Sequence, residues 1–172
     1  MSLNHDIAAC FEEIATLLVL TGANAFRVNA HLRVARALED LAAPVPSDLA
    51  ALQAIDGIGK SSAQKILEFL ETDEILELHT LRADVPRGLT NVLRVPGLGA
   101  KTVRRLWTEL GVESVTDLKR ALADGRVGEM DRMGAKTVQN LIEAIAFMES
   151  SGGRIRLGLA TTISEGIRSA LE

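Results

Sequence analysis

Apolar residues recur every three to four positions along most of this chain. Ile7, Phe11, Ile14 and Leu18 set this period first and predict a helix over residues 4–20. A short helix is expected to begin at Ser47-Asp48. The same spacing predicts further helices over residues 25–41, 60–71, 74–81, 89–94, 100–110, 115–123, 135–149 and 156–171. No segment alternates as a half-buried strand would, so the sequence predicts an all-α fold.

A pair of glycines around one apolar residue interrupts this helical pattern twice. Gly57-Ile58-Gly59 precedes the helix at residue 60, and Gly97-Leu98-Gly99 precedes the helix at residue 100. A third copy, at residues 131–137, keeps Gly134 but has Arg132 in place of the first glycine. Short helices precede the first two copies, so the repeated unit is helix, hairpin, helix.

Such a hairpin suits anion binding, because glycine permits a tight turn and the first amides of the next helix have no intrahelical acceptor. Glycines also end helices for structural reasons alone, and this is the alternative for a single copy. Three related copies favour DNA binding through phosphate contacts, which carry no sequence information.

Composition limits the other functions. The 172 residues fit one or two small domains, and 47% hydrophobic residues suffice for a core. Aromatic residues make up 3% with no tyrosine, which argues against single-strand binding by base stacking. The single Cys10 allows no internal disulfide. Neither a leader nor a transmembrane stretch is apparent, so a cytoplasmic protein without a membrane partner is expected.

The charge is unevenly distributed. The net charge is −4, which by itself is unfavourable for DNA binding. Residues 93–120, however, hold six basic and three acidic residues around the second hairpin. Positive charge is therefore concentrated beside a proposed phosphate site, and modest, salt-sensitive affinity is expected.

The order and spacing of these motifs resemble the N-terminal region of bacterial family X DNA polymerases over the whole chain. The motifs that carry the resemblance are Phe26-Arg27-Val28-Asn29-Ala30-His31, residues 55–66, Val85-Pro86-Arg87-Gly88-Leu89, Arg94-Val95-Pro96-Gly97-Leu98-Gly99, Gly134-Ala135-Lys136-Thr137 and Arg156-Leu157-Gly158-Leu159-Ala160. The chain departs from the family pattern at Ala25, His31 and Ser61, where the family has proline, tyrosine and a phosphate-binding lysine.

The resemblance implies two small helical subdomains built around helix-hairpin-helix motifs. Residues 1–85 would bind the 5′-phosphate at a DNA gap, and residues 86–150 would grip the duplex. Residues 151–172 would be a linker and a helix leading toward a palm domain. The implied DNA contacts are Arg27, His31, Gly57, Gly59, Lys60, Ser61, Gly97, Gly99, Lys101, Thr102, Arg104, Arg105, Gly134 and Lys136.

Lys65 aligns with the Schiff-base lysine of the family members that are abasic-site lyases. Attack on a sugar aldehyde requires a neutral amine, which desolvation or neighbouring cations such as Lys60 and Arg27 would favour. The alternatives are a solvated lysine or a simple phosphate contact. The loss of a lysine at Ser61 removes one positive charge, so only slow lyase activity is expected.

The other candidates also have ordinary alternatives. Arg27 could be a surface arginine and His31 a surface histidine on an amphipathic helix. Lys101 and Lys136 could simply solubilise their helices, and Arg104 and Arg105 could pair with Glu109.

The resemblance also implies a monovalent cation, Na⁺ or K⁺, in each of the first two hairpins, with no other cofactor needed for binding. The backbone carbonyls that would hold it belong to Gln53, Ile55 and Ile58, and to Leu93, Val95 and Leu98.

No polymerase chemistry is expected from this sequence alone. No aspartate follows Asp131, whereas a polymerase palm needs carboxylates that hold two metal ions. The sequence therefore predicts the non-catalytic part of a repair polymerase acting on gapped or nicked duplex DNA. The alternatives are a lyase and a protein-interaction module whose last apolar stripe meets a palm domain or a partner protein.

Overall fold

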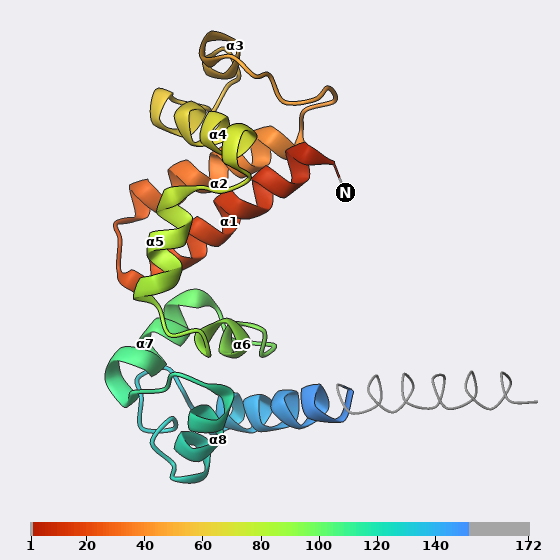
Figure 1. The fold of residues 1–172 in the computed structure, drawn as a ribbon. Coiled ribbons are helices and arrows are strands. Elements are labelled where there is room, and N and C mark those ends of the chain that lie inside the picture. The colour runs from red at the N-terminus through yellow and green to blue at the C-terminus, as the bar shows by residue number, and fades with distance from the viewer. Residues whose placement is uncertain (1, 152–172) are drawn as a thin grey trace, which may run out of the picture.

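The computed structural model describes residues 2–151, and they form an all-α protein, as the sequence predicts. Figure 1 shows two groups of helices, joined where α5 leads into α6. The labelled helices are α1 (Leu3–Thr21), α2 (Ala25–Glu39), α3 (Leu49–Gln53), α4 (Lys60–Thr72), α5 (Leu76–Asp84), α6 (Leu89–Leu93), α7 (Ala100–Leu110) and α8 (Val115–Ala123). A further helix occupies residues 135–151. The helix expected over residues 156–171 lies outside the described residues.

Two helix boundaries differ from the expected ones. Helix α5 runs over 76–84 rather than 74–81, because Ile75 is extended and the Glu68 carboxylate accepts a hydrogen bond from the Leu76 amide. It continues to the residue before Val85-Pro86, where the proline disfavours helical geometry. Helix α2 ends at Glu39 instead of residue 41, and Leu41 packs against the core from outside the helix.

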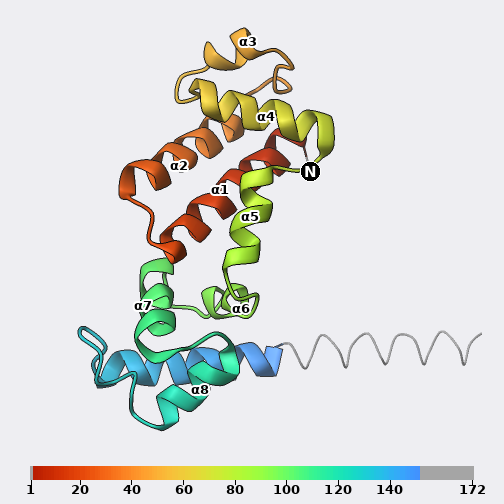
Figure 2. The ribbon, with the colours of Figure 1, turned by 60° about the vertical axis from the view of Figure 1, so that its left-hand side comes forward.

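The upper group in Figures 1 and 2 contains α1 to α5. It is built on the antiparallel pair α1 and α2, with α5 alongside α1. Phe11, Ile14 and Leu18 of α1 are fully buried or nearly so, as their spacing predicts. Asn4 is also buried and donates to the Ala43 carbonyl while accepting from the Val45 amide, each at 2.8 Å. These bonds hold the loop after α2 against the start of α1.

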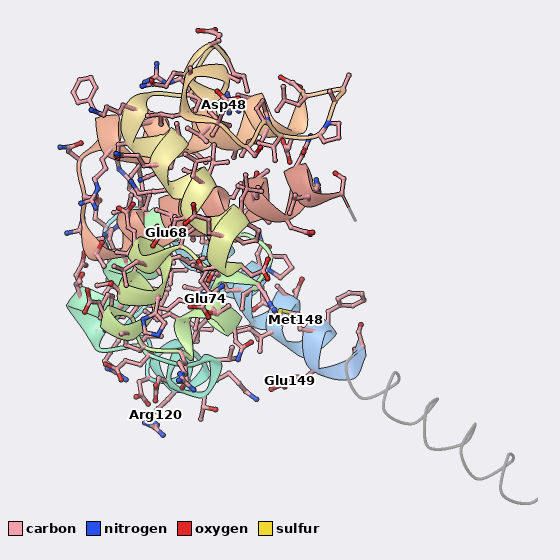
Figure 3. All side chains as sticks on the ribbon, turned by 45° about the horizontal axis from the view of Figure 1, so that its top comes forward. Asp48, Glu68, Glu74, Arg120, Met148 and Glu149 are labelled. Atoms are coloured by element: carbon pink, nitrogen blue, oxygen red, sulfur yellow. The ribbon has the colours of Figure 1, made fainter. Side chains whose placement is uncertain are left out.

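The lower group contains α6, α7, α8 and the helix of residues 135–151. Val103, Leu106 and Leu118 are fully buried, and Leu141 of the last helix is 1% exposed. Helix α1 also packs against α7, so the buried side chains of the two groups form one continuous cluster. Figure 3 shows Met148 and Glu149 on the part of the last helix that extends away from both groups.

Candidate nucleic-acid interface

All three predicted hairpins adopt the same backbone turn. The amides of Ile58, Leu98 and Met133 each donate to the carbonyl three residues earlier, and all three distances are 3.1 Å. The residue before each of these amides has a positive φ, which is +88° at Gly57, +89° at Gly97 and +63° at Arg132. This is the conformation of the third residue of a type II β-turn, and it explains the glycine in the first two copies.

The third hairpin keeps this turn although Arg132 replaces the glycine. A left-handed conformation costs a non-glycine residue about 1–2 kcal/mol, so the surrounding structure must hold Arg132 in place. Within the turn, Asp131 provides one such contact, because its carbonyl accepts a hydrogen bond from Arg105 of α7 at 2.8 Å. The sequence identified this copy as degraded. The backbone shows that it retains the turn, although residues 124–132 before it form turns instead of a short helix.

The first two hairpins leave helix amides free. Helices α2 and α8 begin with the side-chain caps Asn24 and Ser114, whereas Gly59 and Gly99 have no side chain to cap α4 and α7. In the described part of the chain, the backbone amides of residues 60–62 donate no hydrogen bond. A Cβ built on Gly59 or Gly99 meets no atom within 4 Å, so the space above both turns is open to another molecule.

The basic side chains around the second hairpin lie in different settings. Lys101 is exposed, and no ion pair involves it among residues 2–151. The Arg104 guanidinium lies over Gly22 at the C-terminal end of α1, where a helix dipole favours a cation. Arg105 bonds both Glu109 oxygens, at 2.8 and 3.2 Å, as well as the Asp131 carbonyl. The pairing with Glu109, which the sequence offered as the alternative to DNA contact, is therefore present for Arg105.

A shallow depression of about 600 Å³ lies beside the first hairpin. It is lined by hairpin residues 53–59, Ser62, and Ala30 and Arg33 of α2. Arg33 is exposed and forms no ion pair within residues 2–151. Sequence reasoning did not select Arg33 as a site residue, because its position beside the hairpin depends on how α2 packs against residues 55–59.

A second cluster joins α2, α4 and α5 around the Glu77 carboxylate. Glu77 Oε1 accepts a hydrogen bond from Arg27 Nη2 at 2.5 Å. Its Oε2 is 3.2 Å from Lys65 Nζ and 3.7 Å from His31 Nε2, and it has no well-aligned hydrogen bond. Lys65 Nζ also donates to Ser61 Oγ at 2.9 Å.

The members of this cluster are buried to very different extents. His31 is 6% exposed as a residue, and its ring lies 5.7 Å from that of Phe11. The Lys65 side chain is 19% exposed, whereas that of Arg27 is 55% exposed. The interpretation of His31 as a surface histidine is therefore wrong: it faces the core side of α2. Lys65 is likewise not a fully solvated lysine, which was one of the alternatives for it, because its side chain is mostly buried.

Burial and charge set the protonation of this cluster. Burial lowers the pKa of His31, Glu77 opposes this shift, and the Lys65 and Arg27 cations add to it. For Glu77, burial acts to raise the pKa, but the hydrogen bond from Arg27 and the Lys65 charge outweigh it and leave the pKa below its usual value. At neutral pH the cluster thus contains a neutral imidazole and an ionised carboxylate.

Arg27 and the first hairpin amides do not line the same depression. Arg27 and Lys65 line a second depression of about 580 Å³, together with Glu68, Glu77 and Asp84. None of its lining residues borders the depression at the hairpin. The structure thus brings together Arg27, His31, Ser61 and Lys65, while Lys60 is exposed at the start of α4 and Lys136 is exposed after the third hairpin.

The buried His31 predicts a pH-dependent stability. Because its pKa is lower in the folded protein, the unfolded chain binds a proton more readily, and the free energy of unfolding should fall as pH drops below about 6.5. His31→Phe should flatten this slope. Urea denaturation at pH 7.5 and 5.5 measures it, with His79→Gln at an exposed histidine as the control. An equally steep slope in His31→Phe would contradict the assignment.

Two family models match the chain. The model described as a helix-hairpin-helix domain matches residues 2–75, which contain the first hairpin. The model described as a SAM-like helix-hairpin-helix tandem matches residues 89–146, which contain the second and third. The chain is also 31% identical over 166 residues to the DNA polymerase/3′-5′ exonuclease PolX of Bacillus subtilis (strain 168). That alignment covers 96% of this chain and 29% of the relative.

This chain contains helix-hairpin-helix domains and, over nearly its full length, is similar to the N-terminal part of a family X DNA polymerase. The tandem match agrees with the observation that the third hairpin of this region retains the turn despite Arg132. The family resemblance and the all-α expectation are thus confirmed, whereas the roles of single residues stay predictions.

Two further features of this helix-hairpin-helix region concern ligands and membranes. Within residues 2–151, no group of three or more His, Cys, Asp or Glu side chains is arranged to hold a metal ion. Over the same residues, each helix is too short or too polar to cross a bilayer.

Proposed function

We propose that this chain binds duplex DNA without sequence preference and acts at gaps, as the non-catalytic part of a family X DNA polymerase. The observation that carries the proposal is the repeated hairpin: three copies share one turn, and the first two open onto uncapped helix amides. Backbone amides and a helix dipole attract phosphate but read no base.

The second and third hairpins would grip the duplex together. Arg105 joins them through the Asp131 carbonyl, so their spacing is fixed before DNA binds. Lys101 next to the second hairpin is free to meet a phosphate, and Thr102 follows it in the same helical turn. This arrangement supports equal affinity for unrelated duplexes and a marked dependence on salt.

A monovalent cation in the first two hairpins is part of the proposal. The Ile55 and Val95 carbonyls each accept one hydrogen bond within the turn and keep a second lone pair. Among the described residues, no donor approaches the Ile58 or Leu98 carbonyls. Together with Gln53 and Leu93, these oxygens suit Na⁺ or K⁺, which would supply positive charge to a bound phosphate.

The resemblance implies that Arg27 contacts the 5′-phosphate of a gap, with Lys60 and the first hairpin amides beside it. Because Arg27 and this hairpin line different depressions, we place the phosphate in the Arg27–Lys65 cluster instead. Arg27 is half exposed and directs its guanidinium into the depression that Lys65 borders. Lyase chemistry through Lys65 stays a prediction, since its amine is already held by Ser61 and Glu77.

The test compares gapped duplexes that end in a 5′-phosphate or a 5′-hydroxyl. We expect about tenfold tighter binding of the phosphorylated gap, the low end for a charge-assisted bond. Arg27→Ala should remove most of this difference, whereas Arg36→Ala, an exposed arginine on the same helix, should keep it. Fluorescence anisotropy measures both, and absence of binding to either duplex would refute the proposed function.

A further inference from the structure

Glu77 stands where a 5′-phosphate would have to bind. Its carboxylate accepts the Arg27 guanidinium at 2.5 Å and lies 3.2 Å from the Lys65 ammonium. A phosphate that used the same two cations would replace these contacts. The cluster of the unbound protein thus contains its own anion, supplied by α5 from 50 residues away in sequence.

The charge around the cluster also disfavours a second anion. Two cations, Arg27 and Lys65, line the depression together with three carboxylates, Glu68, Glu77 and Asp84. Glu68 is engaged in capping the Leu76 amide of α5 at 3.1 Å. Glu77 is the carboxylate in contact with both cations, so it has the largest effect on whether a phosphate dianion is accepted.

The geometry indicates that Glu77 does not serve packing alone. Its Oε2 is buried without a well-aligned hydrogen bond, and so is His31 Nδ1 nearby. Glutamine has nearly the same shape without the charge, and Arg27 and Lys65 border a depression that is open to water, which can solvate them in its place. Replacement of Glu77 by glutamine should therefore leave the fold intact.

We propose that Glu77 is a specificity-determining residue that competes with the 5′-phosphate for Arg27 and Lys65. Occupation of the two cations by Glu77 weakens the discrimination between phosphorylated and unphosphorylated 5′ ends. This inference rests on the proposed function for its DNA ligand. It concerns the side chains of the cluster and leaves the hairpin contacts to the duplex unchanged.

Three DNAs test the inference with the full chain: an intact duplex and a gapped duplex with either a 5′-phosphate or a 5′-hydroxyl. In Glu77→Gln, the affinity ratio between the two gapped duplexes should rise about tenfold over wild type, the low end for a charge-assisted contact. Affinity for the intact duplex should change little. Glu74→Gln removes the same charge from the α4–α5 connection, where no ion pair involves it among residues 2–151, and should keep the wild-type ratio (Figure 3).

An unchanged or smaller ratio in folded Glu77→Gln would overturn the inference, because Glu77 would then be neutral or would position Arg27 for the phosphate. Glu77→Asp provides a second variant in which the carboxylate is withdrawn by one methylene. It should shift the ratio in the same direction by a smaller factor, and no shift would count against the inference.

A readout without DNA separates this inference from the proposed function. Titration of inorganic phosphate into ¹⁵N-labelled protein, followed at the His31 imidazole, should show tighter binding in Glu77→Gln than in wild type. If neither protein bound DNA but Glu77→Gln still bound phosphate more tightly than wild type, only the proposed function would be refuted. Equal phosphate affinity in both proteins would refute the role of Glu77.

Discussion

Gly88→Ala should destabilise the protein by about 3 kcal/mol, at the upper end of the cost of overpacking. Gly88 precedes α6 with φ −65°, a conformation open to any residue, so backbone strain is not the cause. An added Cβ would instead collide with the Glu113 carbonyl oxygen and lie 3.2 Å from Ser114 Cα. These are backbone atoms at the start of α8, and they cannot rotate away as a side chain would.

Differential scanning calorimetry measures this loss, and for a chain of this size about 3 kcal/mol corresponds to a melting temperature lower by roughly 6–12 °C. Gly99→Ala is the matched control, because Gly99 also precedes a helix but its added Cβ meets no atom within 4 Å. The two positions share the replacement of a glycine by alanine before a helix and differ in whether the added Cβ meets backbone atoms. Similar melting temperatures for the two variants would contradict the close approach of α6 and α8.

Gly97→Val should lower affinity for every duplex by about tenfold or more. Gly97 has φ +89°, and forcing a β-branched residue there costs at least about 1–2 kcal/mol or displaces the turn. The nearest atom to an added Cβ is Leu141 Cδ2 at 3.9 Å, so the effect acts through backbone conformation rather than crowding. A displaced turn would misdirect the amides at the start of α7.

Fluorescence anisotropy on two unrelated duplexes at several salt concentrations measures this effect, and both affinities should fall by the same factor. Gly57→Val is the matched control, since Gly57 has nearly the same φ of +88° in the first hairpin. It should weaken binding to an intact duplex less, because the basic residues gather around the second hairpin. Unchanged affinity in a folded Gly97→Val protein would show that this hairpin does not bind DNA.

Local features of the chain were predictable from the sequence. The apolar period of α1 and the capping residues Asn24 and Ser114 define helices through contacts three to four residues apart. The hairpin turns likewise depend on glycine at a positive φ and on one hydrogen bond across three residues. The boundaries of α5 could not be predicted from local sequence, because Glu68 of the preceding helix caps its first amide.

The sequence by itself therefore determined most helices of residues 2–151 and the two intact hairpins, because each depends on residues close together in the chain. It also determined the family resemblance, which depends on the order and spacing of the motifs. Only the tertiary structure decided which side chains meet. Arg27 reaches Glu77 across 50 residues, and Arg105 reaches the Asp131 carbonyl across 26. The burial of His31, the place of Arg33 beside the first hairpin and the competing carboxylate of Glu77 all follow from helix packing, and no local pattern encodes the pairs that packing creates.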